Sequence, residues 1–191
     1  MADYVVLASG SGTNFESIAT SRRMSSHRLL ALITDRANAP VVDRADRLGV
    51  PSLVISYEAG RAQAEDRLLD ALGRLQPDLI VLAGFMKILP PAIVDRFRGR
   101  ILNIHPALLP SYPGRNAIER SYADRHSPMG ITVHYVDEGV DTGPVLARVD
   151  ADRSDDPTLE EMEARIHALE HDHYPRIIAE QLDAIERVSK P

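Results

Sequence analysis

Short apolar runs rich in β-branched residues alternate with longer amphipathic segments along most of the chain. This alternation is typical of βαβ units, in which helices bury both faces of a largely parallel sheet. The segments expected to form strands are 4–8, 29–34, 52–55, 79–83, 101–104, 130–135 and 144–149. The helices expected between the first five strands lie near 14–24, 41–48, 61–75 and 90–97. The pattern therefore predicts an α/β fold.

Length and composition indicate one folded domain over residues 1–191. A chain of 191 residues is long enough to bury a stable core without disulfides or structural metals. Its 44% hydrophobic and 26% charged residues are ordinary for a globular protein, and no repeat, low-complexity tract or linker divides it. The complete absence of cysteine excludes disulfides, thiolate metal sites and a cysteine nucleophile.

The charge balance excludes a bulk attraction for polyanions. The chain has 22 Lys and Arg against 28 Asp and Glu, a net charge of −6, so no overall positive field favours nucleic acid or an anionic membrane. The first residues carry no cationic leader, and no apolar run approaches the length of a membrane span. We therefore expect a cytoplasmic protein that binds any anionic ligand through local donors.

A glycine-containing segment, residues 9–14, follows the first expected strand. Glycines let the backbone present several N–H groups to one point at a helix N-terminus, which suits a phosphate. The segment lacks the P-loop spacing and lysine, and Phe15 replaces the third glycine of a dinucleotide fingerprint, although Asp35 could act as a ribose-binding acid. A capping box formed by Thr13 and Glu16 is the alternative that needs no ligand.

Asn103 and His105 end the fifth expected strand. Residues two apart in a strand point to the same side, and open α/β sheets bind ligands at the carboxyl ends of their strands. Histidine can move a proton near neutral pH, and an asparagine amide can donate to an oxygen that gains negative charge. The alternative is a histidine that ends a strand and bonds only to backbone.

An acidic loop, residues 136–143, joins the last two expected strands, which should add to the sheet in an antiparallel or irregular way. A carboxylate beside an imidazole fixes its tautomer and stabilises its charged form. Asp137, Glu138 and Asp141 are the candidate partners of His105, and spacing does not choose among them. A solvated acidic turn is the alternative.

The C-terminal segment predicts one long helix. Asp156 is a suitable N-cap, Pro157 suits the first helical position, and Pro175 is expected to kink the helix. His171 and His173 lack the i, i+4 spacing of two ligands on one helix face, so no metal site is predicted.

Two further features have structural interpretations. His134, in an apolar strand, is interpreted as a core or rim residue. The hydrophobic loop 85–90 either packs against a neighbour or lines a pocket for a flat ligand.

Together these segments resemble the phosphoribosylglycinamide formyltransferase family, the folate-dependent transformylases of purine synthesis. The matching segments follow the family's order and spacing and are 5–14, 81–89, 103–110 and 140–144. The resemblance implies a Rossmann-like three-layer formyltransferase fold with a mainly parallel central sheet and a long C-terminal helix. It also implies a phosphate-binding half over 1–100 and a catalytic and folate-binding half over 101–191.

The resemblance implies transfer of a formyl group from 10-formyltetrahydrofolate to the amine of 5-phosphoribosylglycinamide in de novo purine biosynthesis, without a metal and through a tetrahedral intermediate. Asn103 and His105 would stabilise its oxyanion, while Asp141 would raise the pKa of His105 and help relay the proton. The implied ribonucleotide contacts are Gly12, Thr13, Asn14 and Glu170, and the implied folate contacts are Arg61, Met86, Lys87, Ile88, Leu89, Asn103 and Val140. The implied partners are small molecules, and a homodimer remains open.

Two places depart from the family pattern. Residues 115–118 replace a histidine-containing segment of many relatives, which puts a secondary substrate contact in doubt, and Lys87 stands where arginine is common.

Three alternatives differ from this expectation. Methionyl-tRNA formyltransferase adds a C-terminal domain, whereas the residues after Val149 are expected to form one helix. Formyltetrahydrofolate hydrolase places a regulatory domain before its glycine segment, whereas nine residues precede Gly10 in this sequence. A non-catalytic dinucleotide-binding module would use Gly10, Gly12 and Asp35 but leaves Asn103 and His105 unexplained.

Overall fold

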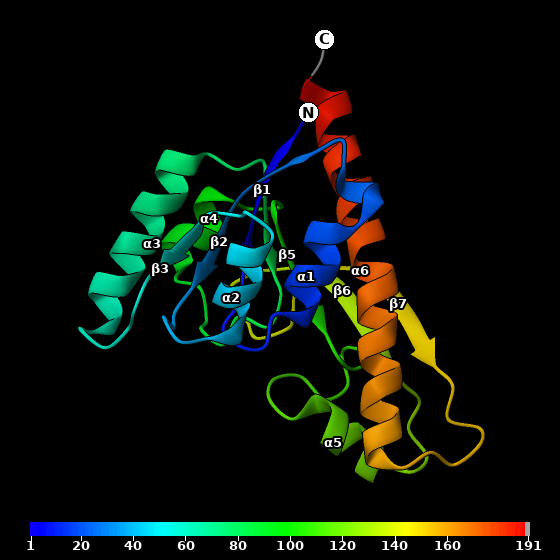
Figure 1. Ribbon diagram of the computed structural model, residues 1–191. Helices are drawn as coiled ribbons and strands as arrows, with labels where there is room; N and C mark the ends of the chain where they lie inside the picture. Colours follow the sequence, from blue (N-terminus) through cyan, green and yellow to red (C-terminus); the bar gives the residue numbers. More distant parts are fainter. Residues whose placement is uncertain (190–191) are drawn as a thin grey trace.

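The computed structural model describes residues 1–189 and shows a twisted sheet flanked by helices (Figure 1). Its strands are β1 (Asp3–Leu7), β2 (Arg28–Thr34), β3 (Ser52–Val54), β4 (Leu79–Leu82), β5 (Ile101–His105), β6 (Met129–Tyr135) and β7 (Val145–Ala151). Its helices are α1 (Thr13–Thr20), α2 (Pro40–Arg47), α3 (Arg61–Leu75), α4 (Pro91–Arg96), α5 (Ala117–Ala123) and α6 (Leu159–Ser189), with a 3₁₀ turn at Arg22–Met24. The predicted α/β fold with a long C-terminal helix is confirmed.

The seven strands form one sheet in the order β3-β2-β1-β4-β5-β6-β7. The first five are parallel to one another, and β6 and β7 pair antiparallel, as predicted for this pair. The chain moves outward from β1 to β3 and then returns to β4 on the other side of β1. Ligands of open α/β sheets bind at such a reversal of strand order, beyond the carboxyl ends of the strands.

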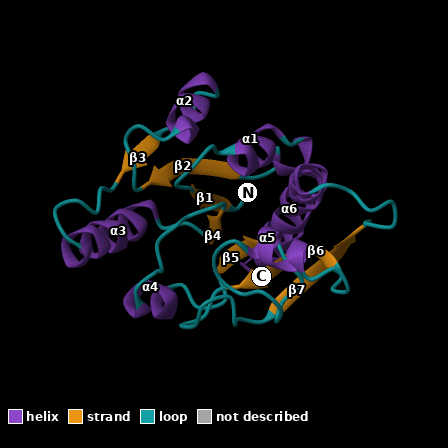
Figure 2. Cartoon of the chain, turned by 90° about the horizontal axis from the view of Figure 1, so that it is seen from below, coloured by secondary structure: helices purple, strands orange, loops and turns teal. Residues whose placement is uncertain are grey.

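Alternate side chains of β1 enter two separate cores. Tyr4 and Val6 pack in the core beneath α1, α2 and α6, while Val5 and Leu7 pack in the core beneath α3 and α4. Figure 2 shows these two sets of helices on opposite sides of the sheet. Because both faces are covered, the strand is buried along its length and reads as a continuous apolar run.

A buried tyrosine holds α6 against β4 and β5. The Tyr174 hydroxyl donates to the carbonyl of Leu82 at 2.9 Å and lies 3.3 Å from the carbonyl of Leu102. These bonds satisfy a phenol with no exposed surface, which apolar burial alone would leave unpaired. They also fix the position of Glu170, which lies one turn earlier on α6.

The start of α6 corrects one prediction. The helix begins at Leu159, and Thr158 rather than Asp156 caps it: the Glu161 N–H donates to the Thr158 hydroxyl at 3.2 Å, and the Glu161 carboxylate accepts from the Thr158 N–H at 2.7 Å. This reciprocal pair is a capping box. The helix then continues through Pro175 to the end of the described residues.

The short helix α5 is absent from the prediction. Its seven residues bury only Ala117 and Ser121, so its sequence shows little helical periodicity. Within residues 1–189, no helix combines the length and the apolar character that crossing a membrane requires.

Candidate active site

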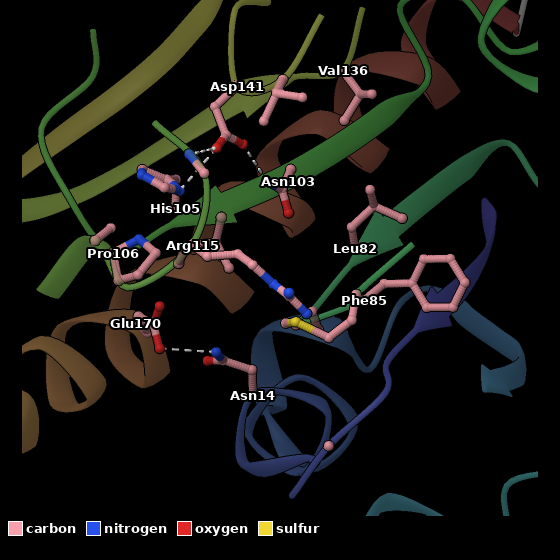
Figure 3. Close-up of a pocket in the computed structure, with 18 of the residues that line it drawn as sticks. Asn14, Leu82, Phe85, Asn103, His105, Pro106, Arg115, Val136, Asp141 and Glu170 are labelled. Carbon is pink, nitrogen blue, oxygen red and sulfur yellow. Dashed lines mark hydrogen bonds and ion pairs between the residues drawn. The ribbon is translucent and has the colours of Figure 1, made fainter. Parts of the chain in front are cut away.

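A cavity of about 900 Å³ opens at the carboxyl edge of the sheet (Figure 3). The loop before α1, the ends of β4 and β5, the loop before α5, the β6–β7 loop and α6 all contribute to its lining. Its volume lies near the upper end of the range for small-molecule sites. The cavity therefore occupies the crevice that the strand order predicts.

Asp141 is the centre of a polar cluster in this cavity. Its Oδ2 lies 3.3 Å from His105 Nδ1 and accepts the Gly114 N–H at 2.8 Å. Its Oδ1 lies 3.3 Å from Asn103 Nδ2 and 3.5 Å from His134 Nε2. Of the three candidate carboxylates, Asp141 is thus the one beside His105. Asp137 instead accepts from Gly139 and Thr142 within its own loop.

The ring of His105 lies between two acceptors. Its Nε2 is 2.8 Å from the carbonyl of Tyr112, which can only accept, so Nε2 carries a proton, while Nδ1 faces Asp141. Burial lowers the pKa of His105, and the opposing charge of Asp141 does not fully offset this effect. Asp141 does raise the pKa of His105, as the resemblance implied, but burial lowers that pKa by more. Burial therefore favours the neutral imidazole, and Nε2 keeps its proton in either form.

His134 belongs to the same cluster, a role that the interpretation as a core residue missed. Its Nδ1 lies 2.8 Å from the Tyr135 carbonyl, which can only accept, so the neutral tautomer that fits this contact has its proton on Nδ1. Its Nε2 then accepts from Asn103 Nδ2 at 3.2 Å. His134 pairs directly with Asn103 across β5 and β6, so only the strand register could have placed it here.

The amide of Asn103 is engaged in the free protein. Its two Nδ2 hydrogens point to His134 Nε2 and Asp141 Oδ1, at 3.2 and 3.3 Å. Donation to a substrate oxyanion therefore requires one of these contacts to be exchanged. Both distances lie at the long end of the hydrogen-bond range, so either contact is weak enough to be exchanged.

The environment of Asp141 predicts an acid-dependent stability. Burial would raise its pKa, but in acid the hydrogen bond from protonated His134, the Gly114 N–H and the charge of the two imidazoles lower it to about 2. An unfolded aspartate takes up its proton below about pH 4, so acid favours the unfolded state. We expect Asp141 to contribute about 1 kcal/mol to the loss of unfolding free energy between about pH 5 and about pH 3.

Urea unfolding at these pH values measures that contribution. Asp141→Asn should lose less stability on acidification than the wild type. Asp43→Asn removes an exposed carboxylate that makes no ion pair within residues 1–189, and it should keep the wild-type pH dependence. Equal pH dependence in Asp141→Asn and the wild type would contradict the assigned environment.

The glycine loop forms the opposite end of the cavity. The backbone N–H groups of Gly12, Thr13 and Asn14 have no acceptor among the residues that the structure describes. Gly12, not Thr13, is the N-cap of α1, and no side chain caps this helix, so the capping-box interpretation is wrong. Asn14 Nδ2 donates to Glu170 Oε2 at 2.9 Å. Three of the predicted ribonucleotide contacts thus lie at the N-terminus of α1, and the fourth, Glu170, bonds to Asn14.

Glu170 is a buried carboxylate in this lining. Only 5% of the residue is exposed. Burial raises its pKa, and the hydrogen bond from Asn14 opposes that rise. The Oδ1 atom of Asn14 is also buried and has no partner within residues 1–189. A ligand that brings N–H or O–H donors to this end of the cavity would satisfy that oxygen.

The conformation of the glycine loop requires glycine at position 12. Gly12 has φ 76°, and a Cβ there would collide with Val41 of α2. We expect Gly12→Ala to lower the unfolding free energy by about 1–3 kcal/mol and to weaken ribonucleotide binding. Gly10→Ala is the matched control, because nothing lies within 4 Å of its added methyl group. Equal stability of the two variants would refute the steric argument.

An apolar strip lies beside the polar cluster. Met86, Ile88 and Val140 are 55%, 58% and 49% exposed, although large apolar side chains are usually buried, and all three line the cavity. The Ser9 hydroxyl accepts the Met86 N–H at 2.9 Å and ties this loop to the glycine loop. Such a strip suits a flat, partly aromatic ligand, and the predicted folate contacts Met86, Ile88 and Val140 form it.

Arg61 is the one predicted folate contact outside the cavity lining. It is the first residue of α3, and its exposed side chain pairs with Glu65 at 2.5 Å. Lys87 does line the cavity, with Nζ 3.4 Å from Asp35 Oδ2. This ion pair engages Asp35, which a dinucleotide-binding protein would use to hold ribose.

The cavity holds an imidazole that carries a proton, a carboxylate and an amide. These groups define an α/β enzyme that can transfer a group while it stabilises negative charge on an oxygen. The family model described as "Formyl transferase" matches residues 2–178. The chain belongs to this formyl transferase family.

Its relatives carry a more specific name. The chain is 38% identical to the phosphoribosylglycinamide formyltransferase of Bacillus subtilis, over the full length of both proteins. It is 37% identical to the trifunctional purine biosynthetic protein adenosine-3 of Drosophila melanogaster, over 91% of this chain and 13% of that protein. The crystal structure of glycinamide ribonucleotide transformylase 1 from Geobacillus kaustophilus matches with a TM-score of 0.88 and 41% identity, over 95% of this chain and 99% of that one.

Proposed function

We propose that this formyl transferase transfers the formyl group of 10-formyltetrahydrofolate to the primary amine of phosphoribosylglycinamide, a step of purine biosynthesis. Two relatives, matched over 100% and 86% of their own length, bear that acceptor in their names. The observation that carries the proposal is the composition of one cavity, which joins free backbone N–H groups, a proton-transfer cluster and an exposed apolar strip. These three parts fit a phosphate, a reacting amide and a pterin-like ring.

The two substrates would bind at opposite ends of the cavity. The N–H groups of residues 12–14 would hold the phosphate at the start of α1, where the helix dipole also favours an anion. Glu170 would accept from the glycinamide end. The strip at 86–89 and Val140 would cover the ring of the donor, and its formyl group would then lie near Asn103 and His105.

The transfer needs no covalent enzyme intermediate. The acceptor nitrogen forms a bond to the formyl carbon, and the electron pair of the C=O bond moves to oxygen. When that pair returns, the bond from carbon to the donor nitrogen breaks. One proton leaves the acceptor amine, and one proton reaches the departing nitrogen. The protein must therefore stabilise an oxyanion and move a proton, and both tasks fall to groups around Asp141.

His105 would provide the main stabilisation of the oxyanion. In the free protein its Nε2 proton is donated to the Tyr112 carbonyl, and in the complex the formyl oxygen would take the place of that carbonyl. As negative charge develops on the oxygen, Asp141 favours the protonated imidazole. Asn103 would donate a second hydrogen bond after releasing His134 or Asp141.

A steady-state assay with both substrates tests the proposed function. Deformylated folate should form only when phosphoribosylglycinamide is also present. Formation of formate at the same rate without the acceptor would favour a hydrolase instead.

Ligand binding separates the enzyme from a dinucleotide-binding module. We expect the ribonucleotide at 100 times its Kd to stabilise the folded protein by about 2.7 kcal/mol, whereas a nicotinamide dinucleotide should not stabilise it. The melting temperature measures both effects. Stabilisation by the dinucleotide alone would overturn the proposal.

Four predictions accompany this function. The division into a phosphate-binding half over 1–100 and a catalytic half over 101–191 is proposed from the positions of these groups. A folate contact by Arg61 and a cytoplasmic location remain predictions from the sequence. A homodimer also remains a prediction, and sedimentation analysis of the purified chain tests it.

A further inference from the structure

Arg115 extends into the cavity from the loop that follows β5, and its side chain reaches toward Phe85 (Figure 3). Its guanidinium has no hydrogen-bond or ion-pair partner among residues 1–189. An arginine in a polar cavity with five unused donors is suited to bind a planar or tetrahedral oxyanion. No step of the mechanism above uses it.

The other permanently charged base of the lining is already paired. Lys87 Nζ lies 3.4 Å from Asp35 Oδ2 and 4.9 Å from the centre of the Tyr57 ring. The Asp35 side chain is only 2% exposed, and Lys87 is the nearer of its two cationic partners, with Arg36 Nε at 3.9 Å. Within the described lining, Arg115 is thus the Lys or Arg side chain whose charge remains available to a ligand.

The backbone around Arg115 is held in place by the catalytic cluster. The preceding Gly114 N–H donates to Asp141 at 2.8 Å. The Tyr112 carbonyl accepts from His105 Nε2 and from Arg120 Nη2, each at 2.8 Å. The loop therefore has a defined position relative to the site, while the long Arg115 side chain can adapt to its ligand.

We propose that Arg115 binds the phosphate of the acceptor, together with the N–H groups of residues 12–14. This inference rests on the proposed function. The N–H groups supply dipoles but no full charge, and a protein of net charge −6 offers no bulk attraction to an anion. A guanidinium can form two parallel hydrogen bonds to a phosphate and supply the missing charge.

Titration with ribose 5-phosphate and with ribose tests the proposal without turnover. Arg115→Ala should bind ribose 5-phosphate about 10- to 100-fold more weakly than the wild type, the usual loss when hydrogen bonds to a charged group are removed. Arg115→Lys keeps the charge but not the paired geometry and should fall between them. Arg125→Ala, which removes a cation outside the cavity lining, should bind as the wild type does.

The kinetic measurement distinguishes the phosphate from the carboxylates of the folate donor. In Arg115→Ala we expect a higher KM for the ribonucleotide, an unchanged KM for the donor, and wild-type KM for glycinamide riboside, which lacks the phosphate. A raised donor KM with an unchanged ribonucleotide KM would overturn the proposal, as would unchanged binding of ribose 5-phosphate. If the wild type shows no turnover, the proposed function fails, and the titration alone decides the role of Arg115.

Discussion

Replacing His105 by alanine is expected to lower kcat by about 10²–10⁴-fold, the usual cost of losing a positioned acid or base. The reason is geometric. His105 lies beside Asp141, and a substrate oxygen can replace the Tyr112 carbonyl as the acceptor of its Nε2–H. The affinity for phosphoribosylglycinamide should stay unchanged, because its phosphate lies at the other end of the cavity in our proposal. Steady-state kinetics and ribonucleotide titration measure the two quantities separately.

Two further variants make this result interpretable. His105→Gln can still donate to the Tyr112 carbonyl but cannot take up or release a proton. A loss of kcat in this variant therefore separates chemistry from folding. His126→Ala removes an exposed histidine outside the cavity lining and should retain wild-type kcat. Near-wild-type turnover of His105→Ala would refute the assigned role.

Asp141→Asn is expected to reduce kcat by a similar factor of about 10²–10⁴. The amide has nearly the same shape but no charge, and with one oxygen it cannot accept from both the Gly114 N–H and the Asn103 amide, as the two carboxylate oxygens do. Because the charge of Asp141 raises the pKa of His105, its removal lowers that pKa further. The acid limb of the kcat profile that reports His105 should therefore move to lower pH.

The pH profile distinguishes this role from a merely structural one. Glu138→Gln is the matched control, since it neutralises an acid of the same loop that lies outside the cavity lining, and it should leave kcat and the pH profile unchanged. A variant of Asp141 that lost activity with no movement of the acid limb would contradict the proposed coupling to His105.

Much of the fold could be predicted because a strand that is buried on both faces has a continuous apolar sequence. The strands β1, β4 and β5 are apolar runs for this reason, and their observed ends differ from the expected ones by one residue at most. Asn103 and His105 share a side of β5 through the two-residue period of a strand, so their placement in one cavity was also predictable.

The partners of these residues depend on tertiary contacts that a sequence pattern does not contain. Asp141 reaches His105 because it has φ 56°, a conformation that few non-glycine residues adopt, and because Gly143 lies against the Tyr135 carbonyl where a side chain would collide. His134 joins the cluster through the register of β5 with β6. Arg115 could be found only by asking which cation of the cavity lining lacks a partner.

The most direct test of the central proposal is to follow the formyl group itself in a single turnover. The donor is labelled with ¹³C in its formyl carbon and mixed with phosphoribosylglycinamide and the wild-type protein, and the products are separated by mass spectrometry. The account predicts that the label appears in the amide of the ribonucleotide, with no labelled formate. Label recovered only in formate, with the ribonucleotide unchanged, would contradict it.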